Sequence, residues 1–311
     1  TLSSSSAASD VYKRQIKNAL TVNEASKTLD LLWDYLEDLG TGIDRTNPLT
    51  WSDDKWPTCA HGGIIPSYGI GHSEAQWFVR GVPNVKKAFA KVWETDDLLT
   101  SFDGVSLWRP WNIDPSWKTQ SGQAWFHIDQ HPISKPGKQC IQGLINLLPT
   151  SKEIGGNVVI PKSHNFFKDI PEEYKERVER LPLDIDHFRF PHDDPKLSSE
   201  PAVMAHMEPG DMLLWDSRTI HCSSSGSSLP EGTNDLIRAA SLICMMPKEL
   251  SSKEILKKRM HAAENLVSTT NWTNDFRNAD EFPVILEAEN RDQYKWPKKP
   301  NLSDYQKELI A

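Results

Sequence analysis

The chain has 311 residues, and its 43 acidic residues outnumber its 35 lysines and arginines, so the formal net charge is −8. An acidic chain has no general attraction for a polyanion, and we therefore expect no nucleic-acid partner. No apolar run approaches the roughly 20 residues that span a bilayer, so we expect no membrane span. The composition is that of a globular protein large enough to bury a substantial core.

The four cysteines are scattered along the chain without a Cys-x-x-Cys spacing. This pattern favours reduced thiols over a disulfide framework or a zinc site. A cytoplasmic location is the expectation that accompanies reduced thiols. The cysteines are Cys59, Cys140, Cys222 and Cys244.

The first residues differ in character from the rest of the chain. Residues 5–15, SSAASDVYKRQ, match the in-frame translation of a sequencing-library adapter. We therefore expect residues 1–15 to be a non-native appendage and exclude them from the fold predictions. The absence of a signal peptide then says nothing about the compartment.

Helical patterns dominate residues 21–95. Thr21 and Glu24 have the spacing of a capping box, and Gly40 can end the helix that they begin. Ser73 is placed to cap a short helix through residue 80, and a further helix is expected from residue 84. We expect these helices to buttress a sheet.

From residue 100 onward the chain contains short apolar segments between turns rich in Gly and Pro. This pattern predicts a mainly β fold with flanking helices, in which the strands form an antiparallel double-stranded β-helix, the jelly-roll or cupin-like barrel. The chain has no Gly-x-Gly-x-x-Gly or P-loop motif, which argues against a doubly wound nucleotide-binding fold. The expected strands are 105–111, a segment near 125, 140–148, 157–160, 202–207, 211–215 and 237–246.

We expect residues 16–311 to form one domain, with a helical buttress at 21–95, a barrel core at 100–247 and a C-terminal wrap at 248–311. Residues 165–200 interrupt the barrel with a charged helix at 172–180 and a loop rich in Pro and Asp. An insertion of this kind is a natural position for a lid or a substrate-recognition loop. Ser251 and Glu254 have capping-box spacing and predict a helix at the start of the C-terminal wrap.

The segment WFHIDQHP at 125–132 carries the most informative pattern. On a strand, residues two apart project from the same face, so His127 and Asp129 should point together. An imidazole and a carboxylate suit a first-row divalent ion such as iron(II), which needs a third ligand from elsewhere in the chain. His221 is the best candidate, because it follows a turn and the buried strand 211–215.

Arg238 opens the apolar run 239–246, and an arginine that leads a buried strand needs an anionic partner. Two histidines and one carboxylate leave metal positions open for a bidentate 2-oxo acid and for dioxygen. Arg238 would then hold the far carboxylate of that acid in a forked pair. Ser223, two residues past His221, is a further candidate for the same carboxylate.

Gln142, Leu144 and Asn146 share one face of an expected strand. If that face points inward, the two amides line the co-substrate pocket.

Each of these assignments has a simpler alternative. Strand amides are often satisfied by backbone groups, the segment 222–228 suits a flexible turn, and Arg238 could form a salt bridge with Asp235 or Asp216. Five other histidines are expected not to be ligands: His131, His164, His187, His192 and His206.

Four sequence blocks together resemble the phytanoyl-CoA dioxygenase family of iron(II)- and 2-oxoglutarate-dependent oxygenases. They are His127-x-Asp129, the segment GGNVVIPKSH at 155–164, the segment from Gly210 to His221, and Arg238. Their order and spacing match the family across residues 125–247. The family usually has glycine where this chain has Lys162, so we expect the backbone there to differ slightly.

The resemblance implies that His127, Asp129 and His221 are the catalytic metal ligands and that Arg238 anchors 2-oxoglutarate. It also implies that 2-oxoglutarate and dioxygen become succinate and carbon dioxide while a small-molecule substrate is hydroxylated. Asp129 fills the position that related halogenases keep open for chloride, which favours hydroxylation over halogenation. Two rival hypotheses are a non-catalytic jelly-roll protein that binds a metal or a small molecule, and a cupin-type metalloenzyme that does not use 2-oxoglutarate.

Overall fold

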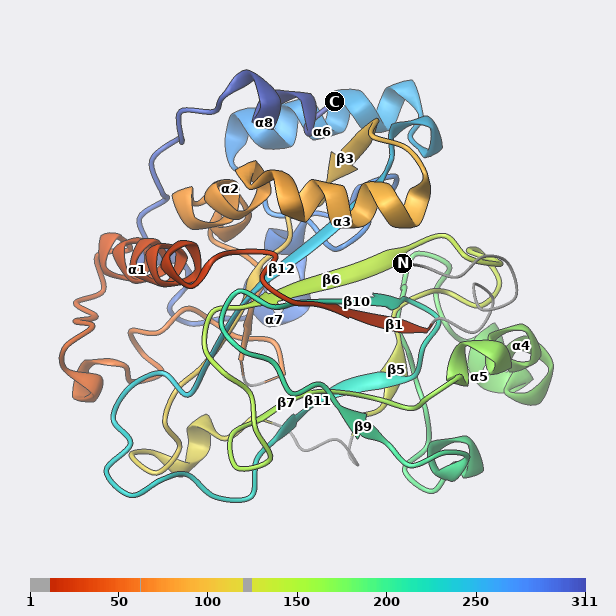
Figure 1. Ribbon diagram of the computed structural model, residues 1–311, viewed down its shortest axis with the longest axis horizontal. Coiled ribbons are helices and arrows are strands. Elements are labelled where there is room, and N and C mark those ends of the chain that lie inside the picture. Colours follow the sequence, from red (N-terminus) through yellow and green to blue (C-terminus); the bar gives the residue numbers. More distant parts are fainter. Residues whose placement is uncertain (1–11, 62, 120–124) are drawn as a thin grey trace.

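Two antiparallel sheets form the centre of the structure and lie one above the other in Figure 1. The computed structural model describes residues 12–61, 63–119 and 125–311. The predicted mainly β architecture with flanking helices is confirmed. Within the described part of the chain, the strands form two separate sheets and do not close into one barrel.

The larger sheet has seven strands in the order β1-β10-β6-β12-β4-β2, with β3 paired to β12 beside this path. The longest strand is β12, which pairs with β6, β4 and β3 and so crosses the middle of the sheet. The strands are β1 (Lys13–Ile16), β2 (Ile64–Ile65), β3 (Leu98–Thr100), β4 (Val105–Trp108), β6 (Ile141–Asn146), β10 (Met212–Asp216) and β12 (Arg238–Pro247).

The smaller sheet has five short strands in the order β8-β5-β11-β7-β9. It is the lower sheet in Figure 1, and its central strand β11 pairs with β5 on one side and β7 on the other. The strands are β5 (His127–Ile128), β7 (Gly155–Val159), β8 (Phe188–Arg189), β9 (Val203–Met204) and β11 (His221–Ser225).

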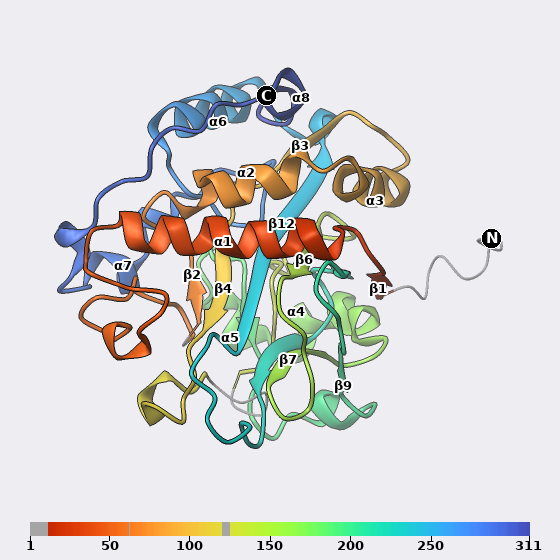
Figure 2. The same cartoon turned by 60° about the vertical axis from the view of Figure 1, so that its left-hand side comes forward.

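Helices cover the outer face of the larger sheet, where α1 and α2 cross in front of β12 in Figure 2. Phe89 of α3 approaches Gly143 of β6 so closely that a Cβ added at Gly143 would lie 2.9 Å from its ring. The large apolar core therefore joins these helices to the sheet. The α-helices are α1 (Val22–Asp38), α2 (Glu74–Gly81), α3 (Pro83–Trp93), α4 (Ile170–Glu173), α5 (Lys175–Glu179), α6 (Lys253–Asn265), α7 (Pro283–Leu286) and α8 (Asp304–Glu308).

The predicted starts of α1 and α2 agree with the structure, whereas α3 begins at Pro83, one residue before the expected start at 84. Thr21 and Glu24 form both halves of a capping box at the start of α1, and Ser73 accepts a hydrogen bond from the Gln76 amide at the start of α2. The prediction that Ser251 caps the later helix is wrong by one residue. Ser252 is the N-cap of α6 and accepts from the amide of Ile255. The expected helix at 172–180 is split into α4 and α5.

The strand around His221 differs from its expected form. The buried strand ends at Asp216, a turn follows, and His221 begins the new strand β11. Ser223 is therefore on a strand and not in a flexible turn, because β11 is paired with β7 along its whole length. β5 covers only His127 and Ile128, and Asp129 lies just beyond it, where its amide donates to the Ser217 carbonyl at 3.0 Å.

The edge strand β1 includes residues that the adapter hypothesis excludes from the fold. Lys13 to Ile16 pair in register with β10, from Lys13 opposite Trp215 to Ile16 opposite Met212. Residues 13–15 are therefore part of the sheet in this structure, and the non-native origin of residues 1–15 stays a prediction. Among the described residues, no helix has the length and apolarity to cross a membrane.

Lys162 adopts the backbone conformation that glycine favours. Its φ angle is 59°, in the left-handed region that is unfavourable for residues with a Cβ atom. The local backbone thus keeps a glycine-like turn despite the lysine side chain. A difference in backbone from other family members at this position stays a prediction.

Candidate metal and co-substrate site

The three predicted metal ligands lie together between the two sheets. His127 Nε2 is 3.3 Å from Asp129 Oδ1, and His221 Nε2 is 3.2 Å from Asp129 Oδ2. One ligand atom from each residue lies within 4.8 Å of the others. The register of the smaller sheet places His127 of β5 directly opposite His221 of β11. Two neighbouring strands thus bring two imidazoles and one carboxylate to one point.

Both imidazoles are oriented by backbone carbonyl groups. The Nδ1 atom of His127 lies 2.9 Å from the Trp125 carbonyl oxygen, and that of His221 lies 2.9 Å from the Thr219 carbonyl oxygen. A carbonyl oxygen can only accept, so each Nδ1 carries the proton and each neutral ring presents the lone pair of Nε2 to the cluster. This is how metal-binding histidines are commonly held. The donor set therefore fits a divalent metal ion.

The electrostatics of the cluster favour a positive charge at its centre. Burial lowers the pKa of His127, but the adjacent Asp129 carboxylate and hydrogen bonds outweigh burial, and the pKa is raised overall. Burial raises the pKa of Asp129, but the two histidines hold it well below its usual range. A metal ion would replace the proton that the raised pKa of His127 retains, and the deprotonated Asp129 is ready to bind it.

A cavity of about 240 Å³ opens beside the three ligands. Both sheets contribute to its walls, with Gln142 and Arg238 from the larger sheet and Ser223 from the smaller one. The predicted metal and co-substrate residues therefore share one cavity. The cavity leaves space for bound molecules beside a metal held by the three residues.

Arg238 is buried in this cavity wall without a carboxylate partner. Its side chain is 1% exposed, and its guanidinium lies over the Trp108 ring at 4.5 Å from the ring centre. Nη1 donates to Ser223 Oγ at 3.4 Å, while Nε is buried without a hydrogen-bond partner. Burial lowers the pKa of Arg238 to about 10, so the group remains a cation at neutral pH. No acidic residue in the described part of the chain forms an ion pair with it.

The alternative salt bridge to Asp216 is not present. Asp216 is bound in a fork by Arg218, with Nη2 at 2.7 Å from Oδ2 and Nε at 2.9 Å from Oδ1. Asp235 also forms no ion pair with Arg238. The guanidinium of Arg238 thus faces the cavity as an unpaired buried cation, which requires an anion for its stabilisation.

Gln142 contacts the metal ligands directly. Its Nε2 donates to Asp129 Oδ2 at 2.9 Å, so it orients the carboxylate as well as lining the cavity. Leu144 also lines the cavity, as their shared strand face predicts. Asn146 does not line it and instead lies 3.4 Å from Thr150 Oγ1 through its side-chain amide. The prediction that both amides line the pocket is correct for Gln142 only.

The insertion at 165–200 forms one side of the cavity entrance. β8 places Arg189 opposite His127, and both His187 and Arg189 line the cavity. The Trp125 indole lies between two imidazoles, 4.5 Å from the ring centre of His61 and 5.0 Å from that of His127. The insertion thus contributes residues to the cavity wall, and its role as a lid or substrate-recognition loop stays a prediction.

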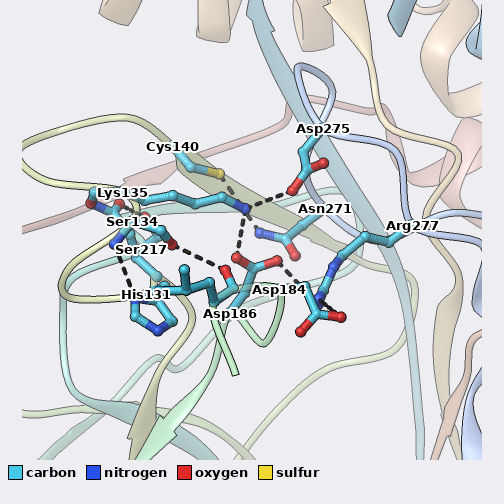
Figure 3. Close-up of polar contacts among 12 residues, drawn as sticks. His131, Ser134, Lys135, Cys140, Asp184, Asp186, Ser217, Asn271, Asp275 and Arg277 are labelled. Atoms are coloured by element: carbon cyan, nitrogen blue, oxygen red, sulfur yellow. Dashed lines mark hydrogen bonds and ion pairs between the residues drawn. The ribbon is translucent and has the colours of Figure 1, made fainter. Parts of the chain in front are cut away.

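Charged side chains tie this insertion to the C-terminal segment (Figure 3). Lys135 Nζ lies 2.5 Å from Asp186 Oδ1 and 2.9 Å from Asp275 Oδ2. Arg277 Nη1 lies 3.4 Å from the other oxygen of Asp186. Three segments that are distant in the sequence therefore meet beside the cavity through one group of ion pairs.

Comparisons with known proteins agree with this geometry. The sequence model of the phytanoyl-CoA dioxygenase family matches residues 98–229. Ava biosynthesis cluster protein O of Aspergillus versicolor is 32% identical over 263 residues, which cover 82% of this chain and 80% of that protein. A putative phytanoyl-CoA dioxygenase of Dictyostelium discoideum is 22% identical over 297 residues, with coverage of 84% and 80%.

The chain belongs to the phytanoyl-CoA dioxygenase family.

Two solved structures show the same fold at low sequence identity. The non-heme alpha ketoglutarate dependent carbocyclase SnoK from nogalamycin biosynthesis has a TM-score of 0.50 at 14% identity, covering 76% of this chain and 80% of that one. GlcNAc Inducible Gene 2 from Candida albicans has a TM-score of 0.52 at 14% identity, covering 96% and 77%. The double-stranded β-helix predicted for this member of the phytanoyl-CoA dioxygenase family is thereby confirmed.

The phytanoyl-CoA dioxygenase family uses iron(II) and 2-oxoglutarate, and the residues of this member fit both. The cluster of His127, Asp129 and His221 has donor atoms that suit iron(II), and Arg238 is a buried cation that lines the same cavity. This chain is accordingly an enzyme of the iron(II)- and 2-oxoglutarate-dependent oxygenase superfamily.

The sequence patterns of this family member did not reveal two further polar residues of the cavity. Asn157 lies directly opposite Ser223 on β7, and its Oδ1 is buried without a hydrogen-bond partner. Ser106 of β4 also lines the cavity with an unpartnered buried hydroxyl. Asn157 lies inside the block 155–164 that carries the family resemblance, but its role depends on strand register, which that block does not encode.

Proposed function

We propose that this chain is a dioxygenase that hydroxylates a small-molecule substrate, with conversion of 2-oxoglutarate and dioxygen to succinate and carbon dioxide. The main support for this proposal is Arg238. It is a fully buried cation without a carboxylate partner in the described residues, in the same cavity as the three metal ligands. A cupin-type metalloenzyme without 2-oxoglutarate would have no general need for such a group.

In this proposal His127, Asp129 and His221 hold iron(II) through Nε2, one carboxylate oxygen and Nε2. When bound, the metal supplies the oxidising chemistry that couples decarboxylation of the 2-oxo acid to attack on a substrate carbon. The carbonyls of Trp125 and Thr219 keep both rings in the metal-binding tautomer. These bonds fix the ring planes before any ligand arrives, which limits reorganisation on binding.

Arg238 would bind the far carboxylate of 2-oxoglutarate, with Ser223 adding its hydroxyl to the same group. The guanidinium is already held over the Trp108 ring, so its orientation is set before the co-substrate binds. Ser106 and Asn157 offer further polar atoms without partners beside it. The flexible chain of 2-oxoglutarate would thus be restrained at both ends.

Hydroxylation is proposed because Asp129 fills the third ligand position with a carboxylate that Gln142 holds in place. A halogenase needs that position for a halide. SnoK, which shares the fold, is described as a carbocyclase, so the fate of the substrate is the point that requires measurement. A product with two hydrogen atoms fewer than the substrate would indicate ring closure or desaturation, whereas a hydroxylated product contains one additional oxygen atom.

The test is anaerobic loading of the protein with iron(II) and 2-oxoglutarate, followed by addition of dioxygen and a panel of small molecules. We expect a metal-to-ligand absorption band when 2-oxoglutarate binds, succinate release, and a product heavier by one oxygen atom. Asp129→Ala is the control, because it removes a metal ligand and should abolish all three signals. Failure of the iron-loaded wild type to bind 2-oxoglutarate would contradict the proposal.

A further inference from the structure

Asp103 lines the cavity of the metal ligands but has no part in the metal or co-substrate site. It lies between β3 and β4, and the next residue, Gly104, accepts a hydrogen bond from the Leu242 amide at 3.2 Å. Leu242 lines the cavity four residues along β12 from Arg238, which corresponds to about 13 Å on a strand. Asp103 is therefore at the opposite end of the cavity from the guanidinium that would bind 2-oxoglutarate.

The Asp103 carboxylate has no cationic partner in the described part of the chain. Its side chain accepts one hydrogen bond, from the adjacent Gly104 amide at 2.8 Å. The nearest buried arginine, Arg80, donates to the carbonyl oxygen of Asp103 at 3.4 Å and not to its carboxylate. Arg80 also donates to the Gly71 carbonyl and lies over the Trp77 ring. Arg80 is thus stabilised by carbonyls and a ring face, which leaves the carboxylate available to a ligand.

The environment of Asp103 disfavours an unpaired negative charge. Burial raises its pKa to about 7, an effect that the Gly104 amide and Arg80 only partly oppose and that the Asp129 carboxylate increases. A cation bound beside the carboxylate would relieve this unfavourable burial. A second carboxylate beside Asp103 would make the burial of its negative charge still less favourable.

The charges of the metal and co-substrate site balance without Asp103, while Arg189 is a further cation in the cavity wall, on the strand that pairs with His127. Iron(II) and Arg238 together balance Asp129 and the two carboxylates of 2-oxoglutarate. Asp103 is then a negative charge in the cavity that neither cofactor neutralises. The surrounding wall combines the apolar side chains of Leu242 and Phe282 with the hydroxyl of Thr270, which is buried without a hydrogen-bond partner.

We propose that Asp103 binds a basic nitrogen of the substrate, so that this enzyme acts on a small molecule carrying an ammonium or guanidinium group. The proposal rests on the proposed function, because it places the substrate in the space that iron and 2-oxoglutarate leave free. Asp103 holds the cation by a charge-assisted hydrogen bond, and Thr270 Oγ1 accepts a second N–H of the same group. The apolar wall packs against the carbon skeleton next to the nitrogen.

The test compares two probes of equal shape, benzylguanidinium and the neutral benzylurea. Each is titrated anaerobically into protein loaded with iron(II) and 2-oxoglutarate, with calorimetry and the metal-to-ligand band as readouts. We expect wild type to bind the cation about ten- to hundredfold more tightly than the urea, and Asp103→Asn to lose this preference. Asp30→Asn, which removes an equal charge from the exposed surface of α1, should keep it.

The outcomes separate this inference from the proposed function. If wild type binds 2-oxoglutarate but does not prefer the cation, the substrate class is wrong and the oxygenase proposal stands. If Asp103→Asn still prefers the cation, Asp103 is not the binding group. If Asp103→Asn fails to fold, the comparison of the two probes on wild type still decides whether the cavity selects a cation.

Discussion

Gln142 Nε2 donates to Asp129 Oδ2 at 2.9 Å, and the same carboxylate oxygen faces His221 Nε2 at 3.2 Å. Gln142 belongs to the larger sheet, while both histidine ligands come from the smaller one. The amide therefore links the metal ligands across the space between the sheets. Its hydrogen bond holds Oδ2 of Asp129 and so fixes the orientation of the carboxylate toward a metal.

Replacing Gln142 should weaken metal binding without removing a ligand. Gln142→Leu leaves Asp129 free to rotate, and loss of such an orienting partner typically costs about 10- to 100-fold in metal affinity. Competition titration with a chromophoric chelator measures the effect. Gln139→Leu, which changes an amide that bonds only the Pro136 carbonyl, is the control. Equal metal affinity in both variants would show that Asp129 is positioned by other contacts.

Removing Arg238 should impair co-substrate binding and spare the metal. Arg238→Ala deletes a charge-assisted contact in a buried pocket, and we expect 2-oxoglutarate to bind more weakly by about 2 to 5 kcal/mol. Arg238→Lys should recover only part of this loss, because an ammonium cannot form the planar fork. Anaerobic titration of the iron-loaded variants measures both affinities.

The matched control for Arg238 is Arg218→Ala. Arg218 is also an arginine beside the sheet, but it pairs with Asp216 and does not line the cavity. It should keep normal affinity for 2-oxoglutarate. Unchanged co-substrate affinity in folded Arg238→Ala would remove the main support for the proposed function.

Metal should stabilise the protein, and this effect should fade as the pH falls. A ligand at a hundred times its dissociation constant adds about 2.7 kcal/mol to the free energy of unfolding. The raised pKa of His127 means that protons compete with the metal at a higher pH than they would for an ordinary histidine. Thermal unfolding with and without a divalent metal across pH 5 to 8, roughly the range where histidine titrates, measures both effects.

In the metal-free protein, the contribution of His127 to the free energy of unfolding should decrease as the pH rises. A histidine with a raised pKa in the folded state contributes stability below its unfolded pKa and loses it as the pH rises through the folded pKa. The gap between the metal-loaded and metal-free melting temperatures should therefore widen from low to neutral pH. A gap independent of pH would indicate that the histidines are not the ligands.

Lys162→Gly should stabilise the protein. Lys162 has a φ of 59°, and relief of this left-handed conformation is worth about 0.5 to 1 kcal/mol after the entropy of glycine is counted. Urea unfolding measures the change. Lys168→Gly, at an exposed position within the helical turn 163–169, should destabilise instead. A loss of stability in Lys162→Gly would mean that the lysine side chain makes compensating contacts.

Lys135→Met should destabilise the junction of the insertion and the C-terminal segment. The change keeps an unbranched apolar side chain beside the Trp272 ring but leaves the buried Asp186 without its closest cation. Breaking a buried pair from one side costs about 3 kcal/mol or more. Chemical unfolding measures this against Lys138→Met, which alters an exposed lysine of the same loop. Equal stability of the two variants would show that Asp186 relies on Arg277.

The sequence by itself predicted the residues of the candidate metal cluster and much of the element order. His127 and Asp129 lie so close in the chain that local geometry brings them together, although β5 is shorter than expected. The caps of α1 and α2 were predictable for the same reason, because a capping box involves residues only three apart. His221 was a candidate because it follows a turn and a buried strand, and the ordered blocks of the family resemblance supported that choice.

Only the tertiary structure decided which polar groups face the cavity and which have partners there. Gln142 reaches Asp129, Arg238 lacks an acid, and Asp103 lies beside the metal ligands because of how β4, β6, β12 and the smaller sheet are paired and stacked. The strand pairings join residues more than a hundred positions apart, such as Arg238 and Trp108, and a register shift of one residue would turn each side chain to the other face. Strand register is set by the packing of the whole core, so no local pattern in the chain could specify these neighbours.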